Sequence, residues 1–562
     1  MFVKITASGS RRYVQLVESY RDEAGRVKKR TVATLGRIDQ LDGELDSVIN
    51  GLLKVSGRGP MASPEVTFES ARSFGDVWTL TELWRSLGFS ALRRAFRRTR
   101  HTTDVEALLR VMVFNRLCDP DSKLGVLRWL QTVALPDIDL EAVTHQQLLR
   151  SMDALVDHHE AVDAVIAGLL RPMIDQDLSV VFYDLTTIRA EGFTSPAGDV
   201  RQFGMAKDGL ITRQFMLGVV QTAEGLPIYH EVFDGNTAET KTLLPTLATV
   251  LDRFPSVRRL ILVADRGLLS LDNLSALNAV RLANGKPLEF ILAVPGRRYS
   301  EFADLLSPFH QSQCRSATAE VIGERAWSDM RLVVAHEPVR AALQTEQRND
   351  QINVLLAQGD EWAGKLDGQD QGIKRRGRKL SDSGAKARFF HAVSEARLSK
   401  IIKVDLKTDL FSYDIDQAAR TLAEMMDGKL LLVTNTVDLS PEEIVARYKS
   451  LADIERGFKV LKSELEIGPV YHRLPDRIRA HAAICFMALI LHRVMRWRLK
   501  AAKADLSPER ALEYLRRIQH HRIRLNATEP VTGISAISAE QTRVLTALAV
   551  KKPALSQQLA LL

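Results

Sequence analysis

Apolar runs of strand length alternate with helical patterns in the middle of the chain. Two of these runs, residues 178–183 and 260–264, are nearly uninterrupted, and each is followed by an acid, as is typical of buried strands. Two β-rich segments flank Glu224 and Gly225, which predicts a hairpin. The predicted elements are, in chain order, strands at 178–184, 213–221 and 227–234, a helix at 239–253, a strand at 258–265, a helix near 270–283 and a strand at 289–295.

This order of elements is that of a ribonuclease-H-like α/β core, in which the first and fourth strands lie side by side. Asp184 ends the first run and Asp265 ends the fourth. We therefore expect the two carboxylates to converge although they are far apart in the sequence. The alternative for each acid alone is the start of a turn or a helix cap.

The gap between Asp265 and Glu455 is too long for a connecting loop, so a folded insertion is expected. Strand-like pieces at 330–335 and 399–404 predict that it is mostly β. The core then resumes with a strand at 428–435. The predicted domains are 1–60, an N-terminal β-hairpin segment; 61–172, a mainly helical region; 173–296, the first part of the core; 297–425, the insertion; 426–500, the second part of the core; and 501–562, a C-terminal helical region.

A third acid lies in a helical pattern that follows the resumed core. Ser440 and Glu443 predict a capping box that opens a helix at Pro441. If this helix continues to residue 462, one face carries a tyrosine, a leucine, an acid and two lysines. These residues are Tyr448, Leu451, Glu455, Lys459 and Lys462. The alternative is a solvated face with ion pairs along the helix.

Two strand-end carboxylates and one helix carboxylate suit a site for two Mg²⁺ ions, since Mg²⁺ prefers oxygen ligands. The formal net charge of +8 favours a polyanionic partner such as nucleic acid, although a basic surface also serves solubility. Residues 93–100 include a basic run in which Arg97 and Arg98 are candidate DNA contacts.

The three cysteines are far apart, so neither a disulfide framework nor a cysteine zinc site is expected. The N-terminus has no signal-peptide pattern. The apolar stretch 482–495 is too short to span a bilayer, so it is interpreted as a buried helix. These features predict a cytoplasmic protein with no membrane partner.

Several segments together resemble the bacterial insertion-sequence DDE transposases that carry a Tyr-Arg-Glu-Lys signature around the third acid. Tyr448, Glu455 and Lys462 match the signature Y-x₂-R-x₃-E-x₆-K, but Leu451 occupies the arginine position. The remaining segments of this resemblance are 183–187, 207–209, 233–241, 263–267 and 478–481.

The resemblance implies a ribonuclease-H-like catalytic domain in which Asp184, Asp265 and Glu455 bind two Mg²⁺ ions, with Mn²⁺ as a substitute. It implies that the helical region 61–172 binds the terminal inverted repeats of the element, and that a homodimer holds two DNA ends before target DNA is joined. Such an enzyme would be associated with the bacterial nucleoid. The candidate DNA contacts are Tyr448, Lys459, Lys462, Arg266, Arg97 and Arg98.

Two alternatives stay open at this point. One is a ribonuclease-H-like nuclease that does not transfer strands, which the long insertion and the Tyr/Glu/Lys pattern disfavour. The other is a DNA-binding derivative without catalysis, which the presence of all three acids disfavours.

Overall fold

The computed structural model describes residues 1–41, 45–57, 66–97, 103–174, 179–192, 194–205, 210–265, 271–372, 380–525 and 529–553. The described chain forms two compact units. One consists of residues 1–71 and 520–535, and the other consists of residues 72–519 and 536–554.

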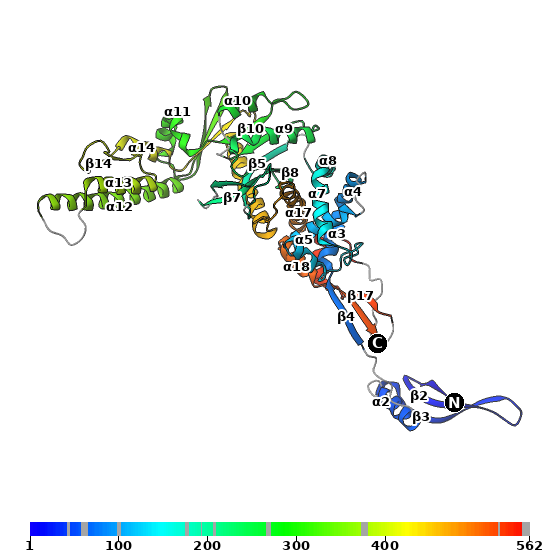
Figure 1. Cartoon of the computed structure of the whole chain (residues 1–562). Helices are drawn as coiled ribbons and strands as arrows, with labels where there is room; N and C mark the ends of the chain where they lie inside the picture. The colour runs from blue at the N-terminus through cyan, green and yellow to red at the C-terminus, as the bar shows by residue number, and fades with distance from the viewer. Residues whose placement is uncertain are drawn as a thin grey trace. The chain divides into compact units, whose positions relative to one another are not determined.

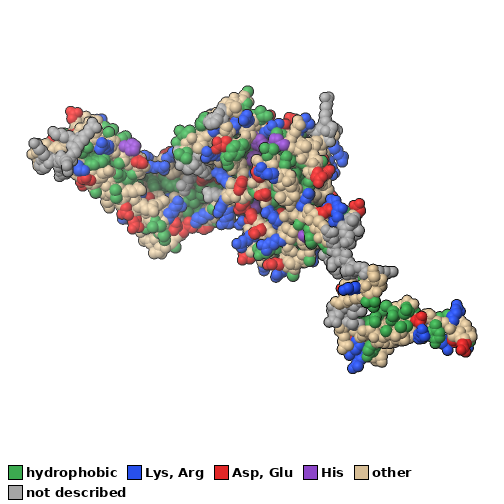
Figure 2. All heavy atoms as spheres, turned by 60° about the horizontal axis from the view of Figure 1, so that its bottom comes forward, with side chains coloured by type: hydrophobic (Ala, Val, Ile, Leu, Met, Phe, Trp, Pro, Cys, Tyr) green, Lys and Arg blue, Asp and Glu red, His purple; other side chains and the backbone are tan. Residues whose placement is uncertain are grey.

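The first unit contains two small three-stranded sheets. The predicted hairpin is confirmed: β2 (Arg11–Arg21) pairs with β3 (Val27–Arg37) through a turn that Asp22 closes by accepting from the amides of residues 24 and 26. A further strand that the sequence did not predict, β1 (Phe2–Ser8), pairs with β2. Figure 2 shows hydrophobic side chains gathered on the surface of this unit, in agreement with the exposure of several β1 and β3 side chains. Two short helices follow, α1 (Ile38–Leu41) and α2 (Leu45–Val55).

The second small sheet corrects the prediction that residues 501–562 are helical. In this sheet β16 (Gln519–Leu525) lies between β17 (Val531–Ile534) and β4 (Val66–Ser73). Helices α18 (Pro508–Arg516) and α19 (Ala539–Ala547) account for the helical part of that segment. Only residues 522–525 of β16 alternate between polar and apolar side chains, which is too short a run to indicate a strand from the sequence.

The described residues from 75 to 173 are mainly helical, as predicted, with a non-helical stretch between Leu130 and His145. Its helices are α3 (Gly75–Ser86), α4 (Leu92–Phe96), α5 (Val105–Cys118), α6 (Lys123–Leu130), α7 (His145–Asp157) and α8 (His159–Leu170), with short turns at η1 (Phe89–Ala91) and η2 (Arg171–Met173). Side-chain caps begin several of them; Asp104, for example, accepts from the amide of Ala107 at the start of α5. Helix α5 is buried on almost every side because it lies in the centre of this layer.

A nine-stranded mixed sheet forms the centre of the second unit (Figure 1). Its strand order is β11-β12-β15-β10-β9-β5-β7-β6, with β8 also paired to β7. The strands are β5 (Ser179–Arg189), β6 (Gln202–Met205), β7 (Ile211–Thr222), β8 (Pro227–Asp234), β9 (Leu260–Ala264), β10 (Glu289–Ala293), β11 (Val321–Trp327), β12 (Met330–His336) and β15 (Lys429–Thr434). The parallel pairing of β5 with β9 confirms the expectation that the first and fourth predicted strands are neighbours.

Helices cover both faces of this sheet. One face packs against the large helical layer, which includes α9 (Leu243–Arg253), α10 (Leu271–Ala279) and α17 (Pro475–Ala501). The other face packs against α15 (Pro441–Lys449), which begins with the predicted capping box of Ser440 and Glu443. By length and composition α17 is able to cross a membrane, but 89% of its apolar stretch is buried inside the protein, as in a core helix.

The prediction that residues 297–425 are mostly β is wrong. Strands β11 and β12 of this segment belong to the main sheet, and only β13 (Ile402–Val404) and β14 (Tyr413–Ile415) form a small hairpin outside it. The remaining elements are helical: η5 (Gly296–Phe302), α11 (Ala303–Phe309), η6 (His310–Cys314), α12 (Pro338–Asp370), α13 (Asp382–Glu395) and α14 (Gln417–Met426).

Helices α12 and α13 of the insertion lie side by side (Figure 1). Between them Ile352 and Leu355 of α12 meet Phe389 and Val393 of α13 in a hydrophobic cluster that is separate from the clusters on the two faces of the main sheet. The apolar stripe of α12 is narrow, which is why its helical period was missed in the sequence.

Candidate active site

The register between β5 and β9 brings two of the predicted acids together. Tyr183 of β5 is opposite Ala264, the last residue of β9, so Asp184 and Asp265 are the next residues along two hydrogen-bonded neighbours. Neighbouring strands lie about 4.8 Å apart. Asp265 follows its strand as predicted, but Asp184 is in the middle of β5, which continues to Arg189. The prediction that both acids end their strands is therefore wrong for Asp184.

Strand alternation places Asp184 on the face of the sheet that α15 covers. Val180 and Phe182, which precede Asp184 by four and two residues, belong to the hydrophobic cluster that contains Ile444 and Val445 of α15. Both acids are half-buried. They lie where the apolar packing under α15 ends, so their carboxylates are sheltered and still accessible to a ligand.

Tyr448, in the last turn of α15, binds one of these acids directly. Its hydroxyl donates a hydrogen bond of 2.8 Å to Oδ1 of Asp265. The ring of Tyr448 packs against the cluster under α15, which fixes the position of the hydroxyl. A predicted DNA contact is therefore also a hydrogen-bond donor to a predicted metal ligand. No local sequence pattern indicates this contact, because the two residues are far apart in the chain.

The third acid, Glu455, lies on α16 (Ala452–Lys459), which packs against β5. The side chain of Glu455 is outside the described residues. The helical stretch predicted for residues 448–462 is interrupted: α15 ends at Lys449, and α16 begins after Leu451. The prediction of one continuous helical face is therefore wrong. Leu451, at the signature arginine position, is buried in the cluster under α15.

The two lysines of the signature region are exposed. Lys459 is at the end of α16, and Lys462 is in the π-helical turn η7 (Val460–Glu464). Lys462 lines a groove of about 410 Å³ together with Thr187 and Arg189 of β5. Lys462 therefore places a positive charge in a groove beside the end of β5, the strand that carries Asp184.

The predicted arginine contacts are only partly described. Arg266 and Arg98 lie outside the described residues. Arg97 is exposed directly after α4. Within the same basic run, Arg93 forms ion pairs with Asp104 and Glu106, so this arginine has a structural partner.

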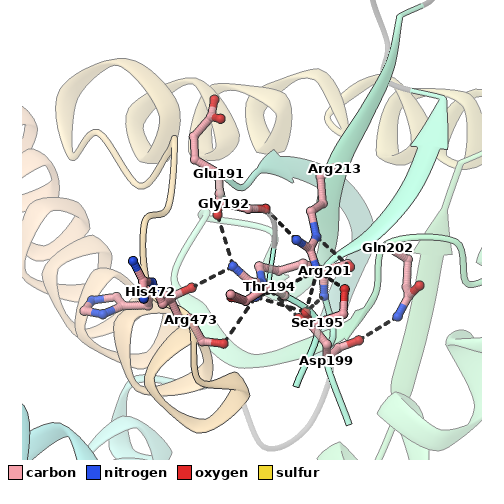
Figure 3. Close-up of polar contacts among 10 residues, drawn as sticks. All are labelled: Glu191, Gly192, Thr194, Ser195, Asp199, Arg201, Gln202, Arg213, His472 and Arg473. Atoms are coloured by element: carbon pink, nitrogen blue, oxygen red, sulfur yellow. Dashed lines mark hydrogen bonds and ion pairs between the residues drawn. The ribbon is translucent and has the colours of Figure 1, made fainter. Parts of the chain in front are cut away.

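A buried arginine fixes the segment that follows β5 (Figure 3). Arg201 is 1% exposed, and its guanidinium donates to both carboxylate oxygens of Asp199 at 2.9 and 3.0 Å. It also donates to four carbonyl oxygens, those of Glu191, Thr194, His472 and Arg473. Burial opposes ionisation of Asp199, but its arginine partners hold the pKa of that carboxyl below its usual range.

These contacts join the segment after the acid-bearing strand to the segment before α17. Backbone hydrogen bonds between Val470 and both Arg189 and Glu191 add to the connection. Sequence reasoning missed Arg201 altogether, because its partners near residue 472 are distant in the chain and no local pattern indicates them.

Glu464, His492 and Glu509 form a separate cluster of residue types that bind metals. Nε2 of His492 lies 2.5 Å from Glu509 and 3.1 Å from Glu464. Burial alone would lower the pKa of His492, but its hydrogen bonds with the two glutamates raise it. The pKa of Glu509 is lowered: burial opposes this, and the hydrogen bond with His492 outweighs it. A protonated histidine between two carboxylates is an ion triad, which links η7, α17 and α18.

Comparisons with known families agree with this arrangement. Residues 175–491, more than half of the 562-residue chain, match the family model of the transposase DDE domain. Residues 3–65 match the IS1634 family transposase N-terminal domain. No curated protein matches the chain.

The sheet, its adjacent carboxylates and the match over residues 175–491 define the class, a transposase with a DDE domain, which is an enzyme that cuts DNA. More particularly, the chain belongs to the insertion-sequence DDE transposases, and its N-terminal segment is similar to that of the IS1634 family. The resemblance found in the sequence is thereby confirmed.

Proposed function

We propose that the chain binds the terminal inverted repeats of its insertion sequence, cuts DNA strands at the repeat ends and joins them to target DNA. The observation that carries this proposal is the β5–β9 register, which makes Asp184 and Asp265 neighbours. Strands β8, β7 and β5 are consecutive antiparallel neighbours, and β9 and β10 follow them parallel to β5. This strand order supports a ribonuclease-H-like core.

Divalent metal ions fit this pair of acids. Two half-buried carboxylates on neighbouring strands offer the oxygen ligands that Mg²⁺ prefers, and α16 packs against β5 with Glu455 in its sequence. Asp184, Asp265 and Glu455 would hold two Mg²⁺ ions, with Mn²⁺ as a substitute. When bound, such ions stabilise the attacking and leaving oxygens of an in-line displacement at phosphorus.

Other residues of the chain orient the metal ligands and bind the phosphates of DNA. Tyr448 holds Asp265 in one orientation through its hydroxyl, so that carboxylate needs little reorganisation. Lys459 and Lys462 are exposed and suited to phosphates of the DNA end, and Arg97 is suited to a phosphate further along the repeat. Because the displacement needs no covalent protein intermediate, no serine or tyrosine nucleophile is assigned.

A homodimer holding two DNA ends completes the proposal, since joining both ends of an element to one target requires two active sites in one complex. The nucleoid is the proposed place of action.

The test is a cleavage assay with a labelled duplex that carries the inverted repeat flanking the gene. We expect Mg²⁺-dependent nicking at the repeat end by the wild type. The variants Asp184→Asn, Asp265→Asn and Glu455→Gln should bind the duplex without nicking it. Asp252→Asn, an exposed acid on α9, is the matched control and should nick normally.

The assay also separates the alternatives. Nicking by the wild type without joining to a target plasmid would indicate a nuclease that does not transfer strands. Specific binding without nicking would indicate a derivative without catalysis. Normal nicking by any one of the three acid variants would remove that residue from the metal site.

A further inference from the structure

A cavity of about 640 Å³ lies between the start of α6 and the segment that leads from η7 into α17. It is lined by cationic and histidine side chains from both parts of the chain. These side chains include Arg116, Lys123, His472, Arg473, Arg477 and His481. None of them belongs to the predicted metal site or to the predicted DNA contacts.

Lys123 is the most unusual of these residues. It is only 6% exposed, and its ammonium forms no hydrogen bond or ion pair with any residue that the structure describes. The two nearby acids are directed elsewhere. The carboxylate of Asp121 accepts from the amide of Ser122 and from Arg128, and Glu466 is exposed to solvent.

Arg116 adds a second buried charge, at 4% exposure. One of its terminal nitrogens donates to the carbonyl oxygens of Leu465 and Glu466, and the other donates to that of Asp121. Its buried Nε has no hydrogen-bond partner among the described residues. Two buried cations therefore lie beside one cavity without a buried acid to balance them.

The ionisation of the cavity residues agrees with this imbalance. Burial, together with the charge of Arg116, lowers the pKa of Lys123 to about 7. Burial also lowers the pKa of His472 to about 4, and that of His481 falls well below its ordinary value. Burying an unpaired charge costs folding free energy, and an anion in the cavity would lower that cost for Lys123 and Arg116.

We propose that this cavity binds a phosphate group. A phosphate oxygen is a strong acceptor for the ammonium of Lys123, and the anion has enough oxygens for Arg473 at the same time, whereas Arg477 is already paired with Asp153. Leu474, the residue before the 27-residue helix α17, also lines the cavity, and no side-chain hydrogen bond caps that helix. Pro475 offers no amide and Asp476 adds a negative charge to the first turn, so the cationic side chains and not this helix end carry the proposal.

The cavity shares part of its wall with the groove beside the candidate active site. Residues 467–469 line it, and the same residues line the groove that contains Lys462 and Thr187. The phosphate would thus belong either to the backbone of DNA that continues beyond Lys462 or to a free phosphate compound. The first source rests on the proposed function, and the second does not.

Two measurements on the full-length protein test the site, each with Lys123→Met, with Lys123→Arg, and with the control Lys386→Met, which removes a buried lysine of the insertion. The first is the salt dependence of binding to the inverted-repeat duplex. If DNA supplies the phosphate, Lys123→Met should lower the slope of log Kobs against log salt by about 1. Lys123→Arg and the control should keep the wild-type slope.

The second measurement is thermal unfolding with inorganic phosphate against sodium chloride at equal ionic strength. If the phosphate is free, its presence should raise the Tm of the wild type but not that of Lys123→Met. In the absence of any anion ligand, Lys123→Met should unfold at a higher temperature than the wild type, because an unpaired buried charge has been removed.

A third measurement uses the wild type alone. The extent of acetylation of Lys123 is determined by mass spectrometry with and without inorganic phosphate or the duplex. Protection by phosphate or by the duplex is expected. If neither the slope, nor the phosphate effect, nor acetylation changes at Lys123, the inference is overturned. If the wild type fails to bind the duplex, the proposed function fails, while the inorganic phosphate measurement still decides whether the cavity is an anion site.

Discussion

Replacing Tyr448 with phenylalanine removes one hydroxyl from the candidate site and leaves the packing of the ring intact. That hydroxyl donates a hydrogen bond of 2.8 Å to Asp265. A hydrogen bond to a charged group contributes about 1.5–3 kcal/mol. Since about 1.4 kcal/mol is tenfold in an equilibrium constant, the variant should bind its metal roughly 10-fold to 100-fold more weakly. Both groups are half-buried, so the lower end of this range is expected.

Three readouts distinguish a positioning role from a DNA contact. We expect Tyr448→Phe to need about 10 times more Mg²⁺ for half-maximal nicking, to bind Mn²⁺ more weakly in calorimetric titrations, and to bind the duplex in EDTA as the wild type does. The matched control is Tyr413→Phe, because Tyr413 donates its hydroxyl to Asp360 inside the insertion. Weaker duplex binding in EDTA with an unchanged Mg²⁺ requirement would refute this reasoning and make Tyr448 the phosphate contact predicted from the sequence.

Three further predictions concern DNA binding and stability. Arg97→Ala should lower the salt slope of duplex binding by about 0.9, and an unchanged slope would remove Arg97 from the interface. Arg201→Met should cost about 3 kcal/mol, because Asp199 loses a buried partner but keeps Arg213, and denaturant unfolding together with proteolysis after β5 would measure the loss. His492→Gln should reduce the Tm more below about pH 6.5 than well above it. Because the pKa of His492 is raised in the folded protein, the ion triad stabilises the fold fully at pH values below the pKa of an unfolded histidine. This stabilisation is lost as the pH rises through the pKa of His492 in the folded protein, so equal losses of Tm at both pH values would contradict the triad.

The sequence was sufficient to predict the centre of the sheet. The apolar runs that became β5 and β9 are buried on both faces, so their composition identifies them as strands without tertiary information. The proximity of Asp184 and Asp265 followed from the order of the elements and was confirmed by the register. Local chemistry also predicted the start of α15, because a capping box depends only on residues that are close in sequence.

The parts that were missed depend on contacts between distant residues. Ser450 and Leu451 form a turn between α15 and α16, and Leu451 is buried in the cluster under α15; a helical repeat alone does not reveal the turn. Tyr448 was assigned to DNA because Asp265, its hydrogen-bond partner, is distant in the chain. The long helix α12 has few buried residues, so its weak period gave less signal than the two short β-rich runs nearby.

After β12 the chain leaves the main sheet, and it re-enters the sheet at β15 directly beside that point. His336, the last residue of β12, is opposite Lys429, the first residue of β15, and the amide of Glu337 donates to the carbonyl of Gly428 just beyond that pair. Because these two strands are already hydrogen-bonded neighbours, a tight turn could replace everything between them without shifting the register. The position is thus a natural graft point, at which evolution or an engineer can exchange one module for another while Asp184 and Asp265 keep their places.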